Sequence, residues 1–98
     1  MTLAEFKNTV LQSDPAPTED PALEALWWAA KSDWNRAHKL VQDQSSRDAA
    51  WVHAYLHRLE GDLSNAHYWY RQAGRAAASG PLEPEWDAIA SAFLAAVR

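Results

Sequence analysis

The sequence contains no cysteine, which excludes disulfide bonds and thiolate metal sites and fits a reducing compartment. Glycine is scarce, and its three residues leave no room for a glycine-rich phosphate-binding loop. Long apolar runs are also missing. The segment from Met1 to Gln12 contains Glu5 and Lys7, unlike a signal peptide or a transmembrane helix. We therefore expect a cytoplasmic protein that has no membrane partner.

Patterns typical of catalysis are absent as well. The chain has no glycine-flanked serine of the kind that hydrolases place on a strand-to-helix turn. The acidic pair Glu83 and Glu85 is typical of the first turn of a helix, where the helix dipole favours negative charge. We therefore predict a protein that is not an enzyme and uses no cofactor. The net charge of −4 argues against a nucleic-acid partner.

Tryptophan is the residue in excess, with six among 98 residues. In a small helical protein most of these side chains are expected in the core or between helices, because each buries a large apolar area. An exposed pair would instead indicate a binding surface. The length of the chain predicts a single domain over residues 1–98.

Apolar residues at helical spacing, together with helix-capping residues, predict an all-α protein of about six helices. Thr2 and Glu5 have the spacing of a capping box. Asp20 and Pro21 suit the start of a helix, and Gly61 suits the end of one. No run alternates between apolar and polar residues, so no β-strand is expected. The predicted helices cover residues 2–12, 20–31, 33–42, 48–60, 63–73 and 83–98.

The two central pairs of helices are related by a shift along the sequence. His38 aligns with His67, a shift of 29 positions that also aligns Ala25 with Ala54. In each pair a small residue lies midway along the first helix, an acid begins the second, and alanine follows four residues later. Small residues at these positions allow two helices to approach closely. The pattern predicts two helical hairpins, of which the better defined covers about residues 48–74.

This second hairpin resembles a tetratricopeptide or Sel1-like repeat. Those families place glycine at the turn between two helices, alanine on the second helix, an aromatic residue four positions later and a further alanine after it. Gly61, Ala66, Tyr70 and Ala73 match this pattern. The tripeptide Trp69-Tyr70-Arg71 is similar to the Sel1 pattern in particular.

The first hairpin, over about residues 20–43, is more divergent. Ser32 replaces the glycine, Val41 the aromatic residue and Gln44 the final alanine. The resemblance implies antiparallel hairpins stacked as a short, right-handed, tetratricopeptide-like array. The first helix and the C-terminal helix, over about residues 83–98, would then cap the two ends of the stack.

In tetratricopeptide arrays a concave groove, lined by the first helix of each repeat, holds partner peptides. Carried over by alignment, this face includes Trp51, Tyr55 and Arg58. Aromatic side chains beside an arginine suit a peptide-binding site. Tyr68 and Arg71, expected on the outer side of the following helix, form a second candidate surface. The alternative is that the C-terminal helix covers the groove.

His53 and His57 lie four residues apart on one predicted helix, a spacing that can place two imidazoles on one metal ion. Glu60, Asp62 or His67 would supply a third ligand only if the fold brought it close. The alternative is that both histidines are partly exposed or pack between helices.

Three functions are compatible with these features. The first is a non-enzymatic helical-repeat module that binds a protein or peptide partner. The second is a metal-binding protein, or a metal-dependent enzyme, that uses His53 and His57. The third is a structural homodimer in which the C-terminal helix pairs across a two-fold axis.

Overall fold

The computed structural model describes residues 1–12 and 15–96, and all of their regular structure is helical. The all-α prediction is thereby confirmed. Among these residues no helix is at once long and apolar enough to cross a bilayer. The six helices are α1 (Leu3–Val10), α2 (Pro21–Ala30), α3 (Trp34–Val41), α4 (Arg47–Glu60), α5 (Leu63–Ala73) and α6 (Leu82–Ala96).

Most helices begin and end where local signals predict. Thr2 and Glu5 form the capping box: the backbone N–H of Glu5 donates to Thr2 Oγ1 at 3.1 Å, and that of Thr2 donates to Glu5 Oε1 at 2.7 Å. The last helix begins slightly earlier than expected, at Leu82. Pro84 therefore lies in the first turn, where its missing N–H has no intrahelical partner to lose.

The turns within the two central hairpins have the same backbone geometry. Ser32 and Gly61, 29 positions apart, both adopt positive φ angles of 65° and 90°. The next residue in each case, Asp33 or Asp62, caps the following helix by accepting from the backbone N–H three residues later. The two turns are thus alike in the backbone even where serine replaces glycine, although a left-handed conformation disfavours a side chain.

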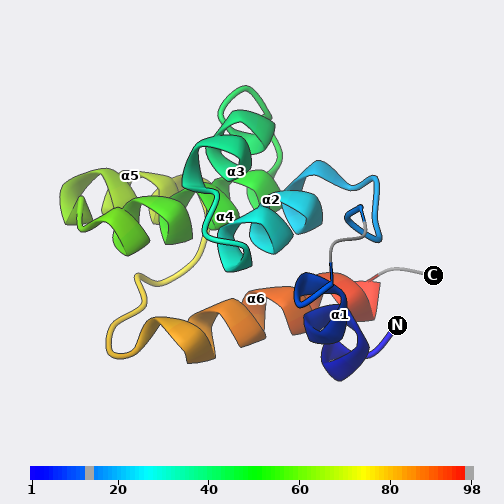
Figure 1. The fold of residues 1–98 in the computed structure, drawn as a ribbon. Helices are drawn as coiled ribbons and strands as arrows, with labels where there is room; N and C mark the ends of the chain where they lie inside the picture. Colours follow the sequence, from blue (N-terminus) through cyan, green and yellow to red (C-terminus); the bar gives the residue numbers. More distant parts are fainter. Residues whose placement is uncertain (13–14, 97–98) are drawn as a thin grey trace.

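The helices form two layers, with α1 and α6 lying together below the four central helices in Figure 1. In the central group α2 packs on α3, and α4 packs on α5. α4 also contacts α2, α3 and α6, so it is the central helix of the molecule. Its residues are accordingly buried on nearly every side between Ala49 and His57.

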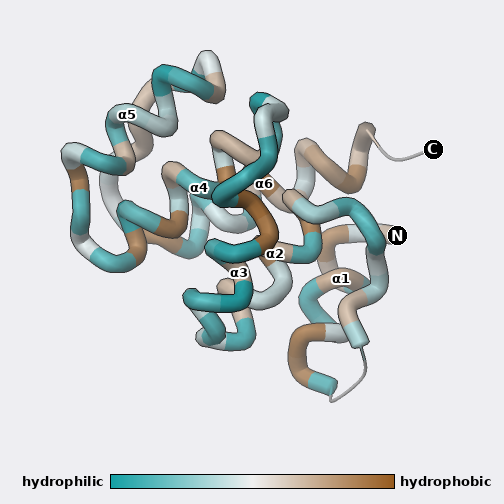
Figure 2. Tube along the Cα trace, turned by 90° about the horizontal axis from the view of Figure 1, so that it is seen from above, coloured by the Kyte–Doolittle hydropathy of each residue, from teal (hydrophilic) through white to brown (hydrophobic). Residues whose placement is uncertain are grey.

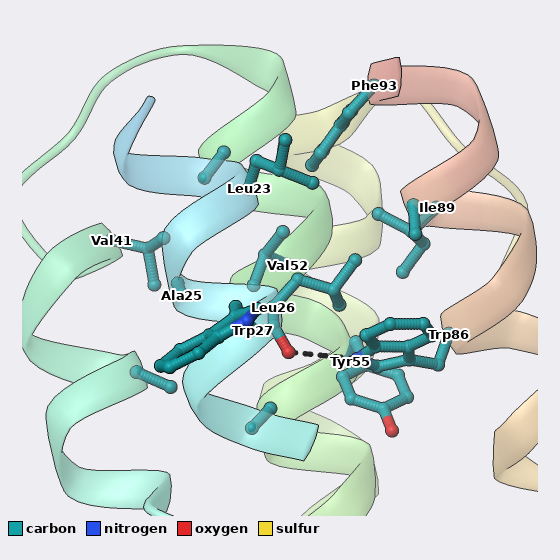
Figure 3. Packing of buried hydrophobic residues seen from close by; sticks show 14 of the residues in the cluster. Leu23, Ala25, Leu26, Trp27, Val41, Val52, Tyr55, Trp86, Ile89 and Phe93 are labelled. Carbon is teal, nitrogen blue, oxygen red and sulfur yellow. Dashed lines mark hydrogen bonds between the residues drawn. The ribbon is translucent and has the colours of Figure 1, made fainter. Parts of the chain in front are cut away.

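The apolar core lies where α2, α4 and α6 meet. Apolar segments of the chain gather around α2 at the centre of Figure 2, whereas α3 and its surroundings are largely hydrophilic. The indole N–H of Trp86 donates to the carbonyl of Leu26 at 2.9 Å and so ties α6 to α2 (Figure 3). Side chains from all three helices meet here, namely Leu23, Leu26, Trp27, Val52, Tyr55, Trp86, Ile89 and Phe93.

None of the six tryptophans is exposed, which confirms their predicted place in the core and between helices. Trp27 and Trp86 are buried. The indole N–H groups also hold neighbouring segments together: that of Trp27 donates to Thr9 Oγ1 at 3.0 Å. The four half-buried members are Trp28, Trp34, Trp51 and Trp69.

Candidate functional site

The helix face predicted to form a peptide groove is covered within the chain. Tyr55 is only 6% exposed and lies beside Trp86 of α6 (Figure 3). Trp51 is half-buried, with its ring edge-on to Phe93 of α6 at a centroid distance of 5.8 Å. Of the two alternatives that the sequence leaves open, the structure therefore shows the second, in which the C-terminal helix covers this face.

Arg58, the third residue of that face, belongs to a buried polar network that joins α4, α5 and α6. Its Nη1 donates to Glu85 Oε1 at 2.8 Å, and its Nη2 donates to the carbonyl of Gly80. Tyr70 donates its hydroxyl to the second carboxylate oxygen of Glu85. The side chains of Arg58 and Glu85 are only 8% and 7% exposed. Buried charges need their partners, so Arg58 is occupied within the chain.

The second candidate surface, on α5, remains open to solvent. Tyr68 is 46% exposed and Arg71 is exposed. The Tyr68 ring lies edge-on to that of Trp69, with centroids 5.0 Å apart. Partner binding at Tyr68 and Arg71 stays a prediction.

Three histidines converge between α3 and α4. His38 comes from α3, while His53 and His57 lie one turn apart on α4. One ring nitrogen of each lies within 4.8 Å of the corresponding atoms of the other two. Nε2 of His38 and Nε2 of His53 are 3.0 Å apart. His53 and His57 are 4% and 7% exposed, so this three-histidine cluster is largely shielded from water.

The spacing of the ring nitrogens is close to that of a metal site. Two ligands of a tetrahedral zinc ion, each about 2.0–2.1 Å from the metal, lie about 3.3 Å apart. The contact between His38 and His53 is near this value, and the widest pair would have to close by up to about 1.5 Å. Without an ion, the same contact is a hydrogen bond in which one Nε2 donates and the other accepts.

A carboxylate orients the third imidazole. Nδ1 of His57 lies 2.7 Å from Glu60 Oε2. A carboxylate only accepts hydrogen bonds, so the proton of the neutral imidazole lies on Nδ1, and Nε2 keeps its lone pair. Metal-binding histidines commonly use one nitrogen for the ion and donate from the other to a carboxylate. In this tautomer Nε2 of His57 is the nitrogen that can bind an ion.

Two indoles fix the other imidazoles by stacking. The Trp34 ring lies nearly parallel to that of His38, with centroids 4.7 Å apart, and Trp69 stacks on His53 at 3.9 Å. Trp34 is itself held in place because its Nε1 donates to the carbonyl of Leu56 at 2.7 Å. The half-buried position of Trp69, expected in the core, is explained by this contact with His53.

The surroundings of His38 and His53 favour the neutral imidazole, which is the form that binds metals. Burial, together with the neighbouring His38 and His57, lowers the pKa of His53 to about 4. Burial also lowers the pKa of His38, and His57 lowers it further. Both lowered pKa values favour uncharged imidazoles at neutral pH. Nδ1 of His53 is buried and has no hydrogen-bond partner among the described residues, so the chain alone does not satisfy this cluster.

His38 was not among the ligands expected from the sequence. The candidates for a third ligand were Glu60, Asp62 and His67, but His67 is exposed on α5 and lies outside the cluster. Glu60 contacts His57 rather than completing the set. A signal for His38 did exist: in stacked hairpins the second helix of one unit faces the first helix of the next, and His38 lies on such a helix.

A second group of possible metal ligands, formed by His57, Glu60 and Asp62, has similar spacing but is a weaker candidate for a metal site. Both acids are exposed, and the Asp62 carboxylate already caps α5 by accepting from the backbone N–H of Asn65 at 3.3 Å. Its pKa is lowered chiefly by this hydrogen bond. We therefore take the three-histidine cluster as the candidate site.

Comparison with known proteins gives no match: no protein-family model, no curated protein and no solved structure corresponds to this chain. Function is therefore inferred from the geometry of the chain itself.

Proposed function

We propose that the protein binds one transition-metal ion through His38, His53 and His57. The observation that carries this proposal is the convergence of three imidazoles, two buried and one half-buried, each with one ring nitrogen within 4.8 Å of those of the other two. His38 belongs to the first hairpin and the other two ligands to the second. An ion bound between them joins the hairpins, and its binding free energy adds to that of folding.

The ligand set limits the choice of metal. Imidazole nitrogen suits zinc, copper, nickel and iron, whereas calcium and magnesium prefer oxygen. Three protein ligands leave one tetrahedral position for water or another molecule. Because Trp34 and Trp69 lie flat against two of the imidazoles, we assign the ion a structural rather than a catalytic role.

The arrangement around the site fits a helical-repeat fold. We infer that α2–α5 form a short, right-handed, tetratricopeptide-like array. α1 and α6 lie together on one side of it instead of capping its two ends, as the sequence had predicted. This inference is supported by the positive φ angles that Ser32 and Gly61 share and by the packing of α4 on both helices of the preceding hairpin.

A partner-binding role is a second proposal, supported by the exposed Tyr68 and Arg71 on α5. Aromatic and arginine side chains are common anchors at protein interfaces. A protein partner that the wild type captures should no longer bind when Tyr68 and Arg71 are both changed to serine. A homodimer through the apolar face of α6 has less support, because Trp86, Ile89 and Phe93 on that face are buried within the chain.

Equilibrium dialysis of protein without a histidine tag tests the metal proposal. The wild type should take up one zinc ion per chain, and His38→Gln and His53→Gln should each weaken binding at least tenfold, because each removes a ligand. Glu60→Gln should weaken it about 10- to 100-fold, since the carboxylate orients His57. His67→Gln, which changes an exposed histidine outside the cluster, is the matched control and should bind as the wild type does. Loss of zinc from His67→Gln instead of His38→Gln would contradict the assignment.

A further inference from the structure

A cavity of about 420 Å³ lies where α1, α2, α4 and α6 meet, away from the three-histidine cluster. Its size falls within the range of about 300–1,000 Å³ that is common for small-molecule sites. Part of its wall is apolar, formed by Val10, Ala30, Leu82 and Trp86. The Trp86 ring stacks on Phe6 and donates a hydrogen bond to the carbonyl of Leu26 on α2, and both contacts hold it in place.

Tyr55 lines the cavity and offers its hydroxyl to it. The residue as a whole is only 6% exposed, and the structure gives its hydroxyl no hydrogen-bond partner among the described residues. This oxygen is not one of the buried unpaired atoms, so it is open to the water of the cavity. Figure 3 shows this hydroxyl pointing away from the apolar side chains of α2 and α6. Burial, with the nearby Glu85, raises the pKa of Tyr55 to about 12, so the hydroxyl stays protonated at neutral pH. It can donate to, or accept from, a molecule in the cavity.

The charged side chains of the same cavity carry an excess of negative charge. Lys7 Nζ lies 2.8 Å from Asp87 Oδ1, and Glu83 lines the cavity without an ion-pair partner among the described residues. Asp87, and to a smaller extent Glu83, raise the pKa of Lys7, so both carboxylates act on this one ammonium group. Two carboxylates and one ammonium leave a net charge of −1, which favours cations and disfavours anions.

We propose that this cavity binds a small amphipathic amine. The ammonium group lies at Glu83 and Asp87, the apolar body lies against Leu82 and Trp86, and a hydrogen-bonding group at the other end reaches the Tyr55 hydroxyl. The Trp86 ring adds an attractive surface for a cation. Lys7 does not block this arrangement, because its side chain is 42% exposed and can move into water. The cavity shares no residue with the three-histidine cluster, so this proposal stands apart from metal binding.

Three probes that share an aromatic ring separate the contributions of the ammonium group and of the hydroxyl to binding in the cavity. Tyramine has both an ammonium and a phenol, phenethylamine lacks the hydroxyl, and 3-(4-hydroxyphenyl)propionate replaces the ammonium with a carboxylate. We expect ligand-observed NMR titrations to show the tightest binding for tyramine. Phenethylamine should bind about three- to tenfold more weakly, as expected for one hydrogen bond. The propionate should show no saturation in the range where tyramine saturates.

Two substitutions then assign the contacts. Tyr55→Phe should weaken tyramine binding to the level of phenethylamine and leave phenethylamine unchanged. Glu83→Gln should weaken both amines about two- to fivefold, as expected for an exposed ion pair. Glu83 is exposed, so this variant keeps the fold even if Tyr55→Phe does not, and circular dichroism checks both. Glu19→Gln, an exposed acid outside the cavity, is the control for net charge.

The proposal is overturned by any of three results. One is a propionate that binds as tightly as tyramine. Another is amine binding that both Tyr55→Phe and Glu83→Gln leave unchanged. The third is a folded wild-type protein that no amine saturates up to about 10 mM, a concentration that corresponds to negligible affinity.

Discussion

Zinc is expected to raise the melting temperature of the tag-free protein by about 10–20 °C when free zinc is a hundredfold above its dissociation constant. The reason is that the binding set exists only in the folded chain, where α3 and α4 bring His38 to within 3.0 Å of His53. Binding at that excess adds about 2.7 kcal/mol to the free energy of unfolding. The melting temperature of a domain of this size is sensitive to such an increment, since 1 kcal/mol of stability shifts it by about 4–8 °C. Thermal melts followed by circular dichroism, with zinc and with a chelator, measure the difference.

Two variants and one change of pH make this measurement specific. His53→Gln should abolish the increase, whereas His67→Gln should retain it. The pKa of His53 is lowered to about 4, so this imidazole stays neutral at pH 6, where an exposed histidine with a pKa of about 6.5 is mostly protonated. Protonation of His53 should therefore not limit zinc binding at pH 6, and the increase must be lost as the pH falls through about 4. An increase that His53→Gln preserves would point to exposed histidines instead.

Glu85→Gln is expected to lower the free energy of unfolding by about 3–5 kcal/mol, a large part of the stability of a small domain. The change removes the charge that faces Arg58 at 2.8 Å and leaves the guanidinium buried without a counter-ion. It also weakens the acceptor for the Tyr70 hydroxyl. Because the network joins α4, α5 and α6, the C-terminal helix should detach more easily. Urea denaturation at neutral pH measures the loss.

The matched control is Glu83→Gln, two positions away on the same helix. Glu83 is exposed, so its replacement should change stability by no more than about 0.5 kcal/mol. Combining Glu85→Gln with Arg58→Met should recover much of the loss, because removing both charges leaves no unpaired ion. Equal effects of Glu83→Gln and Glu85→Gln would show that the buried ion pair is not what holds α6.

The helices were largely predictable from the sequence because their signals are local. The capping box of Thr2 and Glu5 and the left-handed turn at Gly61 act within a few residues of the chain. The serine at position 32 weakened the repeat pattern, yet the backbone there adopts a positive φ, as it does at Gly61. Local hydrogen bonds and the packing of α2 on α3 outweigh the preference for glycine at this turn.

The sites were less predictable because they depend on how distant segments pack. The pairing of Arg58 with Glu85 spans 27 positions, and nothing in either local sequence shows that both are buried. The pair His53 and His57 was visible from its spacing, whereas His38 joins it only because α3 lies against α4. The cavity beside Tyr55 needs four helices to form its wall, so no single motif indicates it.

The central claim is that three imidazoles from two hairpins hold one metal ion. X-ray absorption at the zinc edge, on tag-free protein loaded with one equivalent of zinc, tests this claim most directly, because imidazole ligands give a distinctive multiple-scattering pattern. We predict three imidazole nitrogens and one further light ligand at about 2.0–2.1 Å, with one imidazole fewer in His38→Gln. A spectrum with one imidazole or none, or one that His38→Gln leaves unchanged, would contradict it.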